Sequence, residues 1–138
     1  MFKKGIVYSD GGARGNPGPA AIGIMICDEK GNILKEHSEV IGETTNNVAE
    51  YTGVLVAFEL AKSLGLEEIE YYGDSQLVVR QLSGEYKIKT PHILTLVNQV
   101  REVQKHFQKV RFHQIPREHE KIRMVDKLVN QVLDEEGY

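Results

Sequence analysis

The chain has 138 residues, of which 41% are hydrophobic and 27% charged, a composition typical of one globular domain rather than of a disordered chain. Its single cysteine excludes an intrachain disulfide and a cysteine-rich zinc site and favours a reducing compartment, so we expect a cytoplasmic protein. No apolar stretch has the length of a secretory signal or a membrane span. The formal net charge of −3 speaks against a protein that holds nucleic acid by bulk positive charge.

Three strands are predicted at the start of the chain, joined as an antiparallel meander. A short β-type run at residues 5–9 leads into a loop rich in glycine and proline, Asp10–Ala20. Residues 21–27 are apolar at nearly every position, which is typical of a strand covered on both faces, and the only cysteine is one of its core residues. Charged and apolar residues are interspersed over residues 33–41, which favours a strand at the edge of the sheet.

Helices and strands alternate further along the chain, which predicts parallel strands beside the meander. The polar residues Thr44–Asn47 are candidate N-caps for a helix that continues to about Leu64. Apolar residues cover most of the circumference of this helix, so we expect it to be buried on more than one side. A strand is predicted at residues 68–73, and Asp74-Ser75-Gln76 begins a second helix, which continues to about Leu82.

The last third of the chain predicts two more helices around the second edge strand. Apolar residues from Ile93 to Phe107 lie at helical spacing on one face of the first of these helices. Alternation over residues 110–115 suits the edge strand, and residues 117–123 form a charged loop. The final amphipathic helix follows, with Asp126 in its first turn.

Four carboxylates stand at the ends of predicted strands or in the first turns of predicted helices: Asp10 and Asp74 at strand ends, Glu50 and Asp126 in first turns. Singly, each has an ordinary explanation as a loop residue, a partner of a helix dipole or an N-cap. If the first strand is central, these ends can lie on one side of the sheet, where four like charges repel unless cations separate them. Carboxylate oxygens suit Mg²⁺ or Mn²⁺. Two such ions about 4 Å apart can activate a water and stabilise the leaving oxygen of a phosphoryl displacement.

The chain resembles the type 1 ribonucleases H in four short motifs, which occur in the same order and at similar spacing. The motifs are Asp10-Gly11-Gly12 with Gly15-Asn16-Pro17-Gly18, Thr44–Asn47 with Ala49-Glu50, Asp74-Ser75-Gln76, and Asp126-Lys127-Leu128 with Asn130. The resemblance extends from about Lys4 to Leu133 and implies a single ribonuclease H domain over residues 1–138. The implied fold is α/β, a five-stranded mixed sheet made of the antiparallel meander plus two parallel strands, flanked by helices.

The same resemblance implies an endonuclease that hydrolyses the RNA strand of RNA/DNA hybrids with two Mg²⁺ ions and leaves 5′-phosphate and 3′-hydroxyl ends. In other family members, the residue that corresponds to Asp10 contacts both ions. The residue that corresponds to Asp126 holds the ion that delivers water, and the residues that correspond to Glu50 and Asp74 hold the other ion. Mn²⁺ is expected to substitute for Mg²⁺.

Substrate contacts carry over from the resemblance in the same way. The amides implied to contact base edges and ribose 2′-hydroxyls in the minor groove are Asn16, Asn46, Asn47 and Gln76. The backbone of Gly11 and Gly12 is implied to reach a ribose contacted by these amides, and Thr45 is implied to contact a phosphate of the DNA strand. Short amides suit a 2′-hydroxyl, which both donates and accepts. Helix capping is the alternative explanation for Asn46 and Asn47.

Two departures from the family pattern concern a histidine and a basic protrusion. Many members carry a histidine ten residues before the last aspartate, in a mobile loop, where it assists the attacking water or product release; this chain has Pro116 at that position. His119, seven residues before Asp126, is the candidate for that role, and a solvent-facing loop histidine is the alternative. Only Lys87 and Lys89 stand where many members have the basic protrusion, so we expect modest affinity with a shallow salt dependence.

Two other functions fit the same fold, a DNA-directed nuclease or resolvase and a nucleic-acid-binding module without catalysis. The amides that suit 2′-hydroxyls favour ribonuclease H over the first, and the four filled acidic positions favour an enzyme over the second. We therefore expect a Mg²⁺-dependent ribonuclease H that acts as a monomer and binds neither a membrane nor an obligate protein partner.

Overall fold

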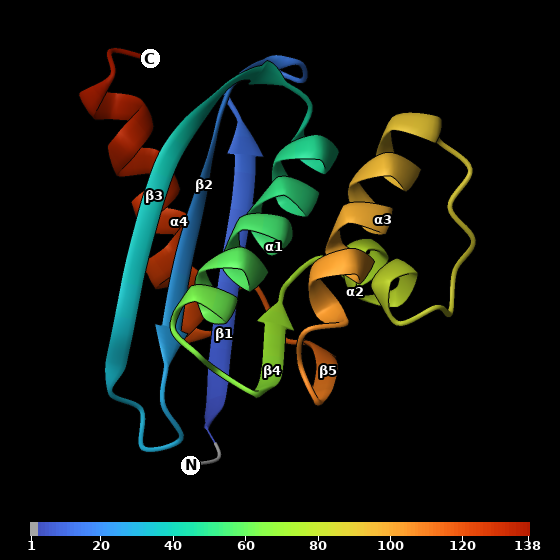
Figure 1. The fold of residues 1–138 in the computed structure, drawn as a ribbon. Helices are drawn as coiled ribbons and strands as arrows, with labels where there is room; N and C mark the ends of the chain where they lie inside the picture. Colours follow the sequence, from blue (N-terminus) through green and yellow to red (C-terminus); the bar gives the residue numbers. More distant parts are fainter. Residues whose placement is uncertain (1–2) are drawn as a thin grey trace.

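Five strands form one mixed sheet in the order β3-β2-β1-β4-β5 (Figure 1), in a computed structural model that describes residues 3–138. β1 is antiparallel to β2 and parallel to β4, β2 is antiparallel to β3, and β4 is parallel to β5. The strands are β1 (Lys4–Ala13), β2 (Gly18–Cys27), β3 (Ile33–Thr44), β4 (Glu68–Gly73) and β5 (Lys109–Gln114). The meander, the central first strand and the two edge strands expected from the sequence are confirmed.

Helices cover both faces of the sheet (Figure 1). The helices are α1 (Asn46–Ser63), α2 (Gln76–Leu82), α3 (Pro91–Gln104) and α4 (Glu120–Glu135). α1 packs on β1 and β2 on one face and carries α3 beside it, while α4 packs on β2, β1 and β3 on the opposite face. The sheet is therefore the middle layer, and residues that alternate along β1 and β2 point toward different helices.

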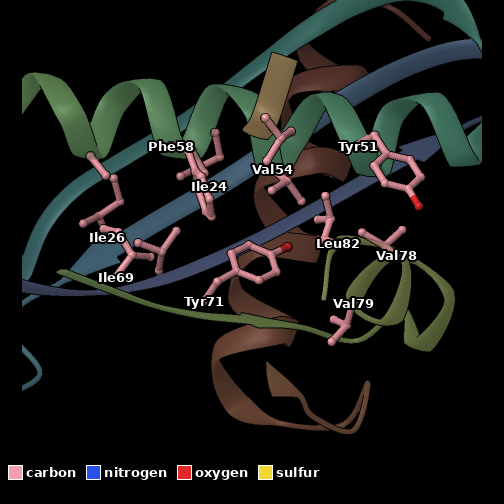
Figure 2. Packing of buried hydrophobic residues seen from close by; sticks show 14 of the residues in the cluster. Ile24, Ile26, Tyr51, Val54, Phe58, Ile69, Tyr71, Val78, Val79 and Leu82 are labelled. Atoms are coloured by element: carbon pink, nitrogen blue, oxygen red, sulfur yellow. The ribbon is translucent and has the colours of Figure 1, made fainter. Parts of the chain in front are cut away.

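The core beneath α1 is built from residues that alternate along β2. Ile22, Ile24 and Ile26 pack in one cluster with side chains of α1 such as Phe58 (Figure 2). The intervening residues face α4, among them the buried Cys27. The continuous apolar run of β2 is explained by this burial on both faces.

Helix termini follow the capping residues of the sequence. Thr45 is the N-cap of α1, and its Oγ1 accepts a hydrogen bond from the backbone N–H of Val48 at 3.2 Å. Gly65, with φ of 75°, follows the C-cap of α1, as expected for a left-handed glycine that ends a helix. Ser75 caps α2 by accepting from the N–H of Val78 at 3.3 Å.

Three boundaries predicted from the sequence were wrong. The glycine-rich segment is not a loop from Asp10 onward, because β1 continues to Ala13 and only residues 14–17 form the turn. Glycine has a low intrinsic preference for strands, but the pairing of residues 10–13 with β2 stabilises the extended conformation there. Glu50 and Asp126 lie in the second turn of their helices rather than the first, since α1 begins at Asn46 and α4 begins within the predicted charged loop.

Candidate active site

Four carboxylates, three from different elements and one from a connecting segment, line one cleft of about 420 Å³. Asp10 belongs to the central strand β1, Glu50 to α1 and Asp126 to α4, while Asp74 lies between β4 and the N-cap of α2. The structure thus brings together the four residues that the sequence motifs single out. Gly11, Gly12 and Asn46 line the same cleft.

Two glycines let the backbones of α1 and α4 approach the sheet at Asp10. A Cβ atom on Gly11 would overlap the carbonyl group of Ala49, the residue before Glu50. On the other face, Gly23 pairs with Asp10 across the β1–β2 ladder, and a Cβ atom there would overlap the carbonyl oxygen of Val125, the residue before Asp126. These close contacts bring Glu50 and Asp126 toward Asp10 from opposite sides of the sheet.

Crowding of these carboxyl groups changes their affinity for protons. Burial, together with the charges of Asp74 and Asp126 and a side-chain hydrogen bond with Asp126, raises the pKa of Asp10 to about 8. Burial also raises the pKa of Glu50 to about 7, with Asp74 adding to the effect and a hydrogen bond from Ser75 opposing it. Near neutral pH the site therefore retains protons unless cations take their place.

The donor set of the cleft fits hard divalent cations. All four acidic side chains offer carboxylate oxygens, the ligands that Mg²⁺ prefers. Within residues 3–138, no three His, Cys, Asp or Glu side chains are grouped so that they could hold an ion by themselves. Mg²⁺ usually keeps several waters and takes only one or two carboxylates plus substrate phosphates. The residues present thus suit ions whose coordination is completed by water and substrate.

Comparison with known proteins points to one family. Residues 8–132 match the family model described as reverse transcriptase-like. Ribonuclease HI of Halobacterium salinarum is 38% identical over 128 residues, and the crystal structure of RNase H1 from this archaeon matches with a TM-score of 0.92, covering 96% of this chain and 98% of that one. The chain belongs to the type 1 ribonuclease H family.

A second solved structure of the family was determined with nucleic acid. LC11-RNase H1 in complex with an RNA/DNA hybrid has a TM-score of 0.89 at 44% identity, with 96% of this chain and 98% of that chain covered. Curated relatives are longer than this ribonuclease H chain. The chain spans 63% of the length of the Halobacterium ribonuclease HI. A bifunctional protein of Mycobacterium tuberculosis is 37% identical over 132 residues, which make up 95% of this chain and 36% of that protein.

Two of the amides that the family resemblance singles out connect the β1–β2 turn to the start of α1. The side-chain oxygen of Asn46 accepts a hydrogen bond from the backbone N–H of Ala13 at 2.8 Å. The side-chain oxygen of Asn16 accepts from the backbone N–H of Asn46 at 3.1 Å. Neither side-chain NH₂ group has a hydrogen-bond partner within residues 3–138, and both residues are exposed. Their oxygens are thus committed to the backbone, and their NH₂ donors face solvent.

The remaining family positions lie outside the lining of the cleft. Thr45 caps α1, so the capping interpretation of Asn46 and Asn47 is wrong. Asn47 and Gln76 are exposed at the first turns of α1 and α2, and Gln76 lies beside the guanidinium group of Arg80, at 2.8 Å when its amide oxygen faces that group.

The candidate histidine, His119, does not line the cleft, whereas the positively charged Arg117 does. His119 is the exposed N-cap of α4, and its Nδ1 accepts from the N–H of Lys121 at 3.1 Å. The charge of Arg117 opposes the rise in the pKa of Glu50. Sequence reasoning missed Arg117, although its position directly after Pro116 in a charged loop was a usable signal.

None of the helices in the described part of the chain, residues 3–138, combines the length and the hydrophobicity that crossing a bilayer requires.

Proposed function

We propose that this chain hydrolyses the RNA strand of RNA/DNA hybrids with two divalent ions, Mg²⁺ or Mn²⁺, held by Asp10, Glu50, Asp74 and Asp126. The observation that carries this proposal is the convergence of these four carboxylates on one cleft, with the pKa values of Asp10 and Glu50 raised to about 8 and about 7. The hybrid bound to the related LC11-RNase H1 supports the choice of substrate.

The acidic residues have separate tasks in this proposal. Asp10 on the central strand would contact both ions, Asp126 from α4 would hold the ion that serves the attacking water, and Glu50 and Asp74 would hold the other ion. When bound, the ions supply Lewis acidity, which activates a water for attack on the scissile phosphate and stabilises the leaving 3′-oxygen. The products carry 5′-phosphate and 3′-hydroxyl ends. The guanidinium group of Arg117, which lines the cleft, adds a fixed positive charge near the phosphate.

Recognition of RNA is proposed to depend on the amides around the start of α1. Since the oxygens of Asn16 and Asn46 accept from backbone N–H groups, their NH₂ groups are oriented to donate outward. Every base pair offers acceptors in the minor groove, and the ribose 2′-hydroxyl accepts as well as donates, so such donors bind RNA without reading its sequence. Asn47 and Gln76 extend this polar surface. The backbone of Gly11 and Gly12 approaches a ribose that these amides contact, and Thr45 contacts a phosphate of the DNA strand. We further propose that the chain acts in the cytoplasm as a monomer, without an obligate protein partner.

The test is cleavage of an RNA/DNA hybrid labelled on the RNA strand, with Mg²⁺ and with EDTA, beside DNA and RNA duplexes of the same sequence. We expect Mg²⁺-dependent cleavage of the hybrid alone, with product 3′ ends that a polymerase extends. Asp10→Asn, Glu50→Gln and Asp74→Asn should each abolish most cleavage and leave the melting temperature unchanged or higher, because a neutral amide adds no charge to the crowded cleft. Glu59→Gln, an exposed position on α1, is the matched control.

Each contrary outcome points to a named alternative. Equal cleavage of the DNA duplex would indicate a DNA-directed nuclease, and binding of the hybrid without turnover in Mg²⁺ or Mn²⁺ would indicate a binding module. Activity near that of wild type in any of the three carboxylate variants would contradict the proposed site.

A further inference from the structure

A buried pair of hydroxyl groups lies beside the carboxylates and has no part in the function proposed above. The hydroxyl of Tyr71 on β4 and the Oγ of Ser9 on β1 are 2.6 Å apart, and both side chains are only 3% exposed. Ser9 immediately precedes Asp10, and Tyr71 stands three residues before Asp74. The pair therefore joins the two strands that carry these carboxylates toward the cleft.

The shape of β4 directs the tyrosine toward this end of the sheet. A Cβ atom on Gly73 would lie 2.9 Å from the hydroxyl oxygen of Tyr71, so glycine leaves the space in which the phenol ring lies along the strand. The ring packs edge to face on Phe58, with centroids 6.0 Å apart. Figure 2 shows the hydroxyl pointing toward the side on which α2 lies. Ring packing thus accounts for the aromatic group but not for its hydroxyl.

A small cavity separates the hydroxyl pair from the carboxylates. It has a volume of about 10 Å³ and is lined by Ser9 and Tyr71 together with Asp10, Glu50 and Asp74. This volume is close to the minimum that admits one water molecule, and the lining offers more than the two polar partners that a buried water needs. The cavity is therefore suited to a single ordered water held between hydroxyls and carboxylates.

Counting hydrogens shows why the pair would act on the carboxylates. Two hydroxyl groups carry two hydrogens, and their mutual hydrogen bond uses only one of them. Burial keeps the pKa of Tyr71 above its usual range, so the phenol retains its proton. The second hydrogen is left for a further acceptor, and a carboxyl group has an oxygen that accepts whether it is protonated or ionised. The side-chain acceptors that line this cavity besides the pair itself are the carboxyl groups of Asp10, Glu50 and Asp74 and the hydroxyl of Ser75, which already accepts from the N–H of Val78.

We propose that Tyr71 and Ser9 are positioning residues, which together with one water in this cavity hold Asp10, Glu50 and Asp74 in the orientation that binds the metal ions. This inference rests on the proposed ribonuclease function and deepens it. Loss of either hydroxyl leaves the carboxylates freer to turn away, so metal affinity and turnover fall while hybrid binding, which depends on other residues, does not.

The decisive variant is Tyr71→Phe, which keeps the packed ring and removes only the hydroxyl. We expect kcat on the hybrid to fall about 10-fold with KM within twofold of wild type, since small misplacement of reacting groups affects turnover strongly. Binding of Mn²⁺ to the free protein, measured by calorimetry, should weaken at least threefold. Tyr72→Phe is the matched control, because this neighbouring tyrosine points to the opposite face of the sheet, where it stacks on His113 and on Tyr8, which packs against the core beneath α4.

Ser9→Ala tests the pair from its other side and decides the matter if Tyr71→Phe fails to fold. In the double variant the loss should be no larger than in the stronger single variant, because both changes remove one unit. Metal affinity and kcat equal to those of Tyr72→Phe would overturn the inference. If the wild type does not cleave the hybrid, the proposed function fails, and the Mn²⁺ calorimetry still decides whether the hydroxyl pair orients the carboxylates.

Discussion

Gly11 and Ala49 form a backbone contact at which β1 and α1 approach so closely that no side chain fits between them. A Cβ atom on Gly11 would overlap the carbonyl group of Ala49 and lie 2.7 Å from the backbone nitrogen of Glu50. The same contact sets the distance between Asp10, which precedes Gly11, and Glu50, which follows Ala49. One glycine therefore serves both the packing of the core helix and the geometry of the carboxylate cleft.

Gly11→Ala should destabilise the protein by about 2 kcal/mol and lower hybrid cleavage, because the added methyl group forces α1 away from the sheet. Unfolding in urea and the initial rate of cleavage measure the two effects. Gly12→Ala is the matched control for stability, since a Cβ atom on Gly12 meets only Val129, at 3.9 Å. Equal stability of the two variants would show that α1 can shift without cost.

The raised pKa values predict that the protein without metal loses stability as the pH rises from about 5 to about 9. Asp10 and Glu50 keep their protons up to about pH 8 and pH 7 in the native state, whereas the unfolded chain releases them near pH 4. The native state then binds more protons than the unfolded state, so the free energy of unfolding is highest below pH 4 as far as these groups are concerned and falls through this window.

Urea unfolding in EDTA at several pH values measures this dependence. Asp10→Asn should reduce the slope, because its amide does not titrate, and Glu59→Gln should leave it unchanged. Millimolar Mg²⁺ should stabilise the protein more at pH 9 than at pH 6, since ions bind the ionised carboxylates. A stability that rises from pH 5 to pH 9 in EDTA, or a slope that Asp10→Asn leaves unchanged, would contradict the retention of protons in the cleft.

Asn46→Asp separates the structural role of the Asn46 side-chain oxygen, which accepts from Ala13, from the proposed role of its NH₂ group as a donor to the substrate. The carboxylate oxygen can still accept from the N–H of Ala13, so we expect stability near that of wild type, whereas Asn46→Ala should lose about 1 kcal/mol. Both variants lack the NH₂ donor and should cleave the hybrid more slowly. The measurement is a cleavage map on a hybrid with a short deoxyribose patch around one cut site.

Wild type should avoid the deoxyribose patch, because a site built to bind a hydroxyl leaves its own groups unpaired there. Asn46→Asp should reduce this preference. A mere repulsion between the new charge and the phosphates would lower cleavage everywhere and leave the preference intact. Equal cutting inside and outside the patch by wild type would mean that these amides do not read the 2′-hydroxyl.

Arg117→Ala is expected to lower cleavage about 10-fold, less than the roughly 100- to 1000-fold that the loss of a donor in direct contact with the reacting group costs. Arg117→Lys should recover part of the loss, because it restores the positive charge. His119→Ala should leave cleavage within twofold and lower stability by about 1 kcal/mol, the usual value of an N-cap. A loss of cleavage in His119→Ala as large as in Arg117→Ala would instead assign His119 the role of the mobile-loop histidine of other family members.

Local patterns in the sequence determined most of the layers and the identity of the acidic residues. The unbroken apolar run of β2 marks a strand buried on both faces, and the polar residues Thr44–Asn47 and then Gly65 mark the ends of α1, because capping and alternation act over a few neighbouring residues. Asp10, Glu50, Asp74 and Asp126 could be named because each stands within a recognisable short motif.

Only the tertiary structure decided how far β1 extends and which side chains share the cleft. Pairing with β2 keeps the glycines after Asp10 in a strand, against their local preference. The contacts of Gly11 with Ala49 and of Gly23 with Val125, the hydrogen bond between Ser9 and Tyr71, and the place of Arg117 all join residues far apart in the chain. Contacts of this kind depend on the packing of whole elements, which no local pattern of residues encodes.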